Sequence, residues 1–199
     1  RDFQACPHPG RGGSNTVRAA DCAALSDPSR SLLGREQERW LADGWDAKRP
    51  WNLVAQQTLM ARFSWRDPST DPTYWTDGWD GYPAARQRLL DGVAQRKLRG
   101  VVVLGGDVHT HYVSSLKSNF DDPQSATLAS EFCGTSIGSR SQPQHQIDAA
   151  LAFNPHVHLG RGDKRGAIVF DVGPKTLRAT LLGVEDARQP DSPVSTLAS

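Results

Sequence analysis

Hydrophobic residues recur at helical spacing in the segment LGREQERWLAD, residues 33–43. This spacing places Leu33, Gln37, Trp40 and Leu41 on one side of a helix. Gly44 follows directly and is a typical helix-ending residue. We therefore predict an amphipathic helix that ends before Gly44.

A second helical pattern covers residues 83–98, PAARQRLLDGVAQRKL. It opens with a proline, which is favoured in the first turn of a helix. Leu89, Leu90 and Val93 form its hydrophobic stripe, and Gly100 follows it as a breaker.

Apolar runs flank this second helix. The segment 51–63 opens with WNLVA and reads as a buried strand that passes into a loop, and VVVLGG at 101–106 reads as a second strand. A helix that links two such strands makes them parallel, with a right-handed crossover. Residues 51–106 therefore predict a β-α-β unit and an α/β fold.

Four later segments are strand-like, namely HYVSSLKS, ATLASEFCGTSI, GAIVFDVG and TLRATLLGVE. The last two, joined through Gly173-Pro174-Lys175, read as an antiparallel hairpin. The tail after residue 185 is expected to be frayed. We expect one domain over 1–199, with a loop at 1–30, an αβ core at 31–137, a loop at 138–162 and the terminal hairpin at 163–185.

Composition limits the function without naming one. Hydrophobic residues make up 37% and charged residues 23% of the chain, which is polar but not disordered. A net charge of +1 gives no patch for nucleic acid or an anionic membrane. No apolar run reaches the roughly 18 residues of a transmembrane segment. The chain starts at Arg1 without a secretory signal, so we expect a processed or truncated chain.

Cys6 and Cys22 lie in a loop rich in Gly, Pro, Ser and Asn. A disulfide across a loop of that size would add roughly 3 kcal/mol of stability. An oxidising compartment would allow this bond. The alternatives are two free thiols in a cytosolic loop, or an intermolecular or metal-binding role for these cysteines. Cys133 lies in an apolar run and is predicted to be a buried small hydrophobic residue.

The strand at 101–104 leads through two glycines into Asp107 and His109, with His111 close behind. Ligands of open α/β sheets bind at the carboxyl ends of parallel strands, and residues two apart in an extended backbone point the same way. A carboxylate with neutral imidazoles suits a divalent or trivalent metal. An aspartate after Gly-Gly is also a common turn residue. The remaining histidines are expected on the surface or in loops: His8, His145, His156 and His158.

The chain resembles the C-terminal half of the catalytic domain of PhoD-type alkaline phosphatases, within the calcineurin-like metallophosphoesterases. The matching stretches, in order, are RDFQAC, LLGREQERWL, WNLVAQQTLMA, DGWDGYPAARQRLL, VVVLGGDVHTHYVSSLK, SEFCGTSI and NPHV. The resemblance implies an αββα sandwich with mixed sheets and hydrolysis of phosphate monoesters and often diesters. It also implies Ca²⁺ and Fe³⁺ as metals and a periplasmic or secreted location, which suits a Cys6–Cys22 disulfide.

The resemblance also implies site residues. Gly106-Asp107-Val108-His109 matches the last metal-ligand motif of the superfamily, with aspartate in place of its first histidine. Asp107 and His109 are therefore expected to bind metal and to take part in catalysis. The preceding motif falls on Gln56 or Gln57, either of which would line the site.

Further candidates surround these ligands. His111 would either touch substrate or pack the strand, and Arg62, close after a strand end, is a candidate phosphate contact. Glu131, inside an apolar run, would either orient a ligand histidine or pair with an arginine. Asp77 and Asp80, in an aromatic stretch, are candidate supporting groups or simple turn residues. The aromatic stretch itself would wall the site or form a structural cluster.

The family's first ligand motifs, an aspartate-bearing strand end and an Asn-His-Asp-type loop, have no counterpart in this sequence. Asp107 and His109 would then form an incomplete set that a missing N-terminal part or a second chain completes. We expect a PhoD-like hydrolase of phosphate esters whose present chain is inactive alone. The alternatives are a phospholipase D-like phosphodiesterase of the same family and a non-catalytic metal-binding or interaction module.

Overall fold

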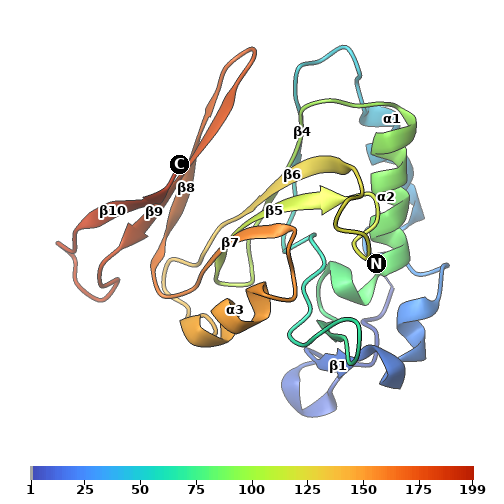
Figure 1. The fold of residues 1–199 in the computed structure, drawn as a ribbon, viewed down its shortest axis with the longest axis horizontal. Helices are drawn as coiled ribbons and strands as arrows, with labels where there is room; N and C mark the ends of the chain where they lie inside the picture. Colours follow the sequence, from blue (N-terminus) through green and yellow to red (C-terminus); the bar gives the residue numbers. More distant parts are fainter. Residues whose placement is uncertain (1) are drawn as a thin grey trace.

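A computed structural model describes residues 2–199 and places most strands in two sheets (Figure 1). The five-stranded sheet contains, in spatial order, β2 (Asn52–Ala55), β4 (Val101–Gly105), β6 (Thr127–Cys133), β5 (His111–Lys117) and β7 (Val157–Arg161). The three-stranded sheet contains β10 (Val194–Ala198), β9 (Leu177–Val184) and β8 (Arg165–Val172). A small ladder pairs β1 (Thr16–Arg18) with β3 (Thr73–Trp75).

The helices within this part of the chain are α1 (Arg35–Gly44), α2 (Pro83–Gln95) and α3 (Gln144–Leu151). Short 3-10 turns are η1 (Pro9–Arg11), η2 (Ala19–Asp21), η3 (Ala23–Ser26) and η4 (Trp79–Gly81).

The predicted β-α-β unit is confirmed. β2 and β4 are parallel neighbours, with Asn52 opposite Val101, and α2 lies between them in the chain. β6 extends the parallel set beside β4, whereas β5 runs antiparallel to both β6 and β7. β8 and β9 form the predicted antiparallel hairpin. The fold is therefore mixed α/β, with sheets of mixed orientation.

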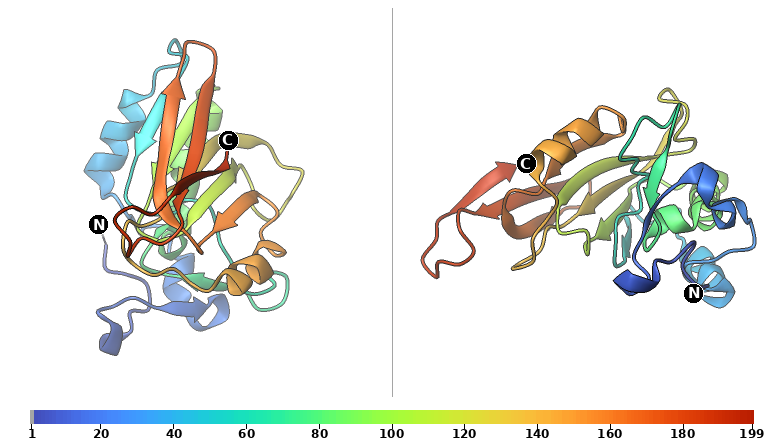
Figure 2. Two further views of the ribbon diagram at one scale, coloured as in Figure 1. Left: turned by 90° about the vertical axis from the view of Figure 1, so that its left-hand side faces the viewer. Right: turned by 90° about the horizontal axis from the view of Figure 1, so that it is seen from below.

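The elements form three layers. Helices α1 and α2 lie on one side of the five-stranded sheet, and the three-stranded sheet lies on the other (Figure 1). In the left view of Figure 2, β8 and β9 stand in front of the larger sheet. The two sheets touch through the rings of Phe132 and Phe170, whose centroids are 5.5 Å apart. The main core lies on the opposite face, where Leu90 and Val93 of α2 share a cluster with Val103 of β4.

The prediction of a loop over 138–162 is wrong, because this region contains α3 and β7. α3 buries Ile147 and Ala150, three residues apart, and exposes polar residues over most of its surface. This short apolar stripe leaves the composition polar. Gly160 in β7 lets α3 approach closely, since an added Cβ would lie 2.8 Å from the side chain of Ile147.

The prediction of a frayed tail is also wrong. β10 pairs antiparallel with β9, from Val194 opposite Val184 to Ala198 opposite Leu181. It is a largely exposed edge strand, so the backbone ladder rather than a hydrophobic pattern defines it. In α1, Trp40 is 71% exposed, which contradicts its assignment to a buried stripe. No residue of α1 is fully buried.

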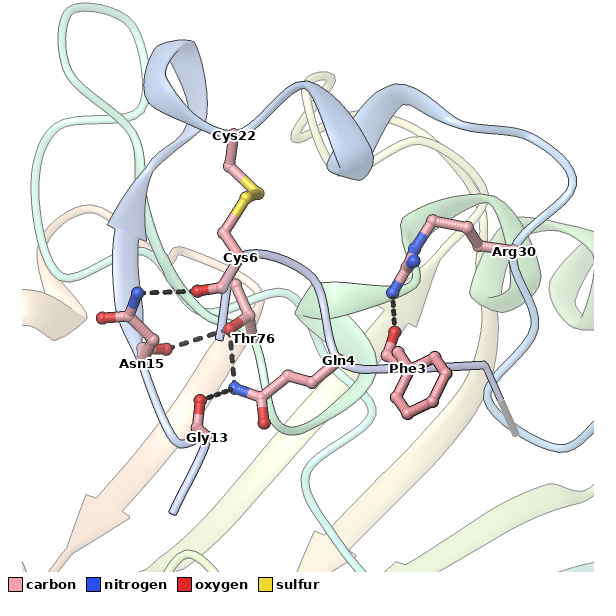
Figure 3. Close-up of a disulfide and its surroundings, with 8 residues drawn as sticks. All are labelled: Phe3, Gln4, Cys6, Gly13, Asn15, Cys22, Arg30 and Thr76. Carbon is pink, nitrogen blue, oxygen red and sulfur yellow. Dashed lines mark hydrogen bonds between the residues drawn. A yellow bond between two sulfur atoms is a disulfide. The ribbon is translucent and has the colours of Figure 1, made fainter. Parts of the chain in front are cut away.

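The N-terminal region is fastened by a disulfide between Cys6 and Cys22 (Figure 3). Cys22 is buried in a small second core with Ala5 and Leu25. Hydrogen bonds continue the attachment, because the Asn15 amide donates to the Cys6 carbonyl at 2.7 Å. The short ladder of β1 and β3 joins the same region to the segment before α2. Among residues 2–199, none of the helices combines the length and the hydrophobicity that a membrane-spanning segment requires.

Reduction of the Cys6–Cys22 bond is expected to lower the free energy of unfolding by about 3 kcal/mol. The bond joins residues 16 positions apart in the sequence, and its loss gives the unfolded chain more conformational freedom. Urea denaturation with and without dithiothreitol measures the change. The Cys6→Ala variant is the control, and its midpoint should not respond to the reductant. An equal midpoint for oxidised and reduced wild type would contradict the stabilising role.

Candidate active site

The end of β4 is shaped by two close backbone contacts. A Cβ on Gly105 would lie 2.4 Å from the carbonyl oxygen of Thr58, so only glycine allows this approach. The next amide, that of Gly106, donates to the Gln57 carbonyl at 3.0 Å. The chain that follows β2 is therefore held against the start of the Asp107 turn.

The backbone of this turn is not extended. Asp107 and His109 have φ values of 65° and 57°, in the left-handed region that few residues other than glycine adopt. The expectation that Asp107, His109 and His111 share one side by strand alternation is therefore wrong. A left-handed turn separates the first two residues from His111, which already belongs to β5.

Asp107 and His109 nevertheless open into the same cleft, which has a volume of about 660 Å³. Asp107 is exposed and His109 is half-buried. Most of the cleft wall comes from the turn after β4, the segment that follows β2, the aromatic stretch before α2, and α3 with its preceding loop, and β1 and β5 contribute one residue each. Residues that line it include Phe63, Trp65, Trp75, Asp80, Gln142 and Gln146.

His109 is oriented by one hydrogen bond. Its Nδ1 lies 3.0 Å from the carbonyl oxygen of Arg140. A carbonyl can only accept, so Nδ1 carries the proton and the neutral ring keeps its lone pair on Nε2. This arrangement is common for histidines that bind a metal.

His111 has the opposite environment. It is fully buried, its Nδ1 accepts from the Thr135 amide at 3.2 Å, and its Nε2 lies 3.2 Å from the Leu182 carbonyl. Burial lowers the pKa of His111, which favours the neutral ring. Both ring nitrogens are engaged, so His111 joins β5 to β9. Of the two roles considered for it, the geometry supports packing rather than substrate contact.

Three other candidates, Gln56, Gln57 and Arg62, are not among the residues that line the cleft. Gln57 is exposed, and its backbone rather than its side chain bonds to the Asp107 turn. Gln56 instead accepts from the Trp79 indole at 3.0 Å and braces the loop. Arg62 pairs with Asp121 and with the Phe120 carbonyl, at a separate cavity of about 240 Å³. The structure therefore does not bring Gln57 or Arg62 to the lining that Asp107 and His109 share.

Glu131 takes neither of its expected roles. Its fully buried carboxylate accepts the amides of Met60 at 2.6 Å and Ala61 at 2.8 Å. It forms no hydrogen bond to a histidine and no ion pair with an arginine within the described chain. Burial raises the pKa of Glu131 to about 7, against the opposing effect of these two donors.

Asp80 lies in the cleft wall but is already paired. Its carboxylate contacts Arg86 at 2.5 Å and accepts the Phe63 amide at 2.9 Å. Burial raises the pKa of Asp80, although the Arg86 charge opposes this shift. Asp77 is half-buried and is not part of the cleft lining.

The aromatic stretch serves both of its expected roles. Trp79 and Tyr82 are buried in the main core, whereas the half-buried Trp65 and Trp75 line the cleft. Gln142 and Gln146, which line the opposite wall, were not predicted. Gln146 lies in α3, whereas Gln142 lies in the loop before this helix, so no single periodic pattern in the sequence marks the pair.

Residues 1–181 match the sequence model of a family described as "PhoD-like phosphatase". The chain belongs to this family, as its motifs predicted.

A curated relative, "Alkaline phosphatase D" of Bacillus subtilis (strain 168), is 36% identical over 177 residues. The match covers 87% of this chain and 30% of that protein. A solved structure described as "Structure of PhoD" superposes with a TM-score of 0.86 at 32% identity, covering 98% of this chain and 36% of that chain. The chain thus spans about a third of the length of these relatives.

Glu131 is expected to make stability fall as pH rises. Its pKa in the folded chain, about 7, lies above the ordinary value of 4.5, so the folded state binds the proton more tightly. The contribution is complete below about pH 4.5 and is lost as pH rises through 7, by roughly 3 kcal/mol in total. The Glu131→Gln variant should lose this slope in urea denaturation from pH 4 to 8.

The relevant quantity is the difference in unfolding free energy between wild type and Glu131→Gln, because other buried groups titrate in the same range. This difference should shrink as pH rises. Glu36→Gln is the matched control, since Glu36 is exposed on α1. A difference that grows with pH would rule out a raised pKa at Glu131.

Proposed function

We propose that this chain forms part of an enzyme that hydrolyses phosphate esters, with Asp107 and His109 in the active site. One observation carries the proposal. Both side chains line one cleft at the carboxyl end of β4, within the region that matches the PhoD-like phosphatase family. This is where open α/β sheets bind their ligands.

The two residues offer complementary donor atoms. The Asp107 carboxylate forms no hydrogen bond or ion pair within residues 2–199, so its oxygens are free to hold a cation. His109 presents Nε2, because Nδ1 is bound to the Arg140 carbonyl. Nε2 can ligate a cation or, when protonated, donate to a phosphoryl oxygen.

These donors fit part of a metal centre. No group of three or more His, Cys, Asp or Glu side chains that could hold an ion is found among the described residues. We propose that Asp107 and His109 supply two of the ligands of a centre containing Ca²⁺ and Fe³⁺. When bound, such cations polarise phosphoryl oxygens and lower the pKa of an attacking water.

The remaining ligands are proposed to come from outside these 199 residues. The matched relatives are about three times as long as this chain, which leaves ample sequence for them. A preceding segment of the same protein or a second chain would supply them. On this proposal, the present chain alone has no hydrolytic activity.

We also propose that the enzyme works in the periplasm or outside the cell. The Cys6–Cys22 disulfide supports this location, because such bonds persist in oxidising compartments and are rare in the cytosol.

Asp107→Asn, made in the complete enzyme, is expected to lower kcat for p-nitrophenyl phosphate by more than about 100-fold. Loss of a residue that only hydrogen-bonds to a metal ligand already lowers metal affinity or activity by about 10–100-fold. Asp107 is proposed as a ligand itself, and an amide oxygen binds cations more weakly than a carboxylate oxygen. Asp122→Asn is the control, because Asp122 is exposed in the turn between β5 and β6. Thermal unfolding of both variants should match wild type.

Full activity in Asp107→Asn would remove Asp107 from the active site. Elemental analysis of the purified complete enzyme is the companion measurement, with iron and calcium expected. A complete protein that holds cations but lacks activity would instead be a non-catalytic metal-binding module, and one that holds no cations and lacks activity would be an interaction module. Comparison of p-nitrophenyl phosphate with bis-p-nitrophenyl phosphate then separates a monoesterase from a phosphodiesterase.

A further inference from the structure

The two histidines of the Asp107 turn are held in opposite tautomers. His109, which lines the cleft, donates from Nδ1 to the Arg140 carbonyl, so in the neutral ring the lone pair lies on Nε2. His111 accepts at Nδ1 from the Thr135 amide and donates from Nε2 to the Leu182 carbonyl. Two residues apart in sequence, the rings thus present different nitrogens. The position of the Arg140 carbonyl decides which nitrogen of His109 is available.

Arg140 lies in an exposed loop, but both of its neighbours in the chain are tied down. On one side, the Ser139 carbonyl accepts from the Ser136 hydroxyl at 2.5 Å and from the Arg165 guanidinium. On the other side, the Ser141 hydroxyl bonds to the Thr110 hydroxyl at 2.6 Å. The loop is therefore attached to both sheets, through Arg165 of β8 and through Thr110 beside β5.

Arg165 is the centre of this attachment. Its guanidinium also donates to the Ser136 hydroxyl at 3.2 Å and to the Gly162 carbonyl. One planar group thus spans three acceptors on two loops, and its forked donors suit this geometry better than the single ammonium of lysine would. It makes no ion pair with an acidic side chain among the described residues. Its bonds to these loops are its evident role.

We propose that Arg165 is a positioning residue that fixes the His109 tautomer by clamping the loop of residues 136–141. With the clamp in place, the Arg140 carbonyl holds the Nδ1 proton and Nε2 remains the atom offered to the cleft. Without it, the carbonyl moves and His109 exchanges between tautomers. The consequence for catalysis rests on the proposed function, whereas the tautomer itself does not.

The test is ¹⁵N NMR of the histidine rings in wild type and Arg165→Met, at about pH 8, where ordinary imidazoles are neutral. In wild type, His109 should show a protonated Nδ1 and an unprotonated Nε2, and His111 the reverse. Arg165→Met should bring the two His109 resonances toward each other and leave His111 unchanged. Arg178→Met is the matched control, because Arg178 is an exposed arginine of the adjacent strand β9.

A milder variant keeps the test decisive if Arg165→Met does not fold. Ser136→Ala removes two bonds of the same clamp and should produce a smaller change of the same kind at His109. A wild-type His109 spectrum in whichever variants fold would overturn the proposal, as would a protonated Nε2 in wild type. In the complete enzyme, Arg165→Met should also weaken metal binding by about 10–100-fold.

The experiments distinguish a failure of the proposed function from a failure of the role proposed for Arg165. If Asp107→Asn retains full activity, the proposed function falls, yet the spectra still decide whether Arg165 fixes the tautomer. If Asp107→Asn is inactive and the spectra of Arg165→Met match wild type, only the role of Arg165 is lost.

Discussion

The structure depends on a buried segment that has no sheet partner. Residues 58–64 cross the core beside the five-stranded sheet, and their backbone groups need partners that no strand supplies. Side chains from distant elements provide them. Glu131 accepts the Met60 and Ala61 amides, Arg86 donates to the Met60 carbonyl, and Asp80 accepts the Phe63 amide. Asn154 pairs with both backbone groups of Ser64, and His156 donates to the Arg62 carbonyl.

This constraint explains why several polar residues resembled active-site residues in the sequence. Glu131 and Asp80, two of these candidates, are buried or nearly so, and such residue types are rarely buried unless they are paired. His156, which was expected on the surface or in a loop, is buried as well. Their function is to satisfy an irregular backbone. Asp107 and His109 differ, because the first has no partner among the described residues and the second has one free ring nitrogen. Sequence cannot separate the two groups, since the partner atoms belong to backbone 17 to 94 residues away.

The fold was predictable where one pattern dominated a segment. The all-apolar run of β4 and the striped α2 sufficed for the β-α-β unit, and the hairpin of β8 and β9 followed from its turn. α3 and β10 were not predicted, because neither has a strong hydrophobic pattern in the sequence. α3 offers only a few apolar residues to the core, and β10 is defined by its ladder with β9. The prediction that Asp107 and His111 point the same way was wrong because Asp107 and His109 adopt left-handed backbone conformations. Nothing in the sequence Asp-Val-His indicates such a turn.

The buried segment also has a consequence for the order of folding. Its partners Glu131, Asn154 and His156 stand 70 to 94 residues further along the chain. Closing loops of that length costs entropy before any bond is gained, so contacts of this kind form slowly. The local turns of α2 and the hairpin of β8 and β9 can form first. We expect residues 58–64 to become ordered after these local elements, together with the hydrogen bond from the Gly106 amide to the Gln57 carbonyl that precedes the Asp107 turn.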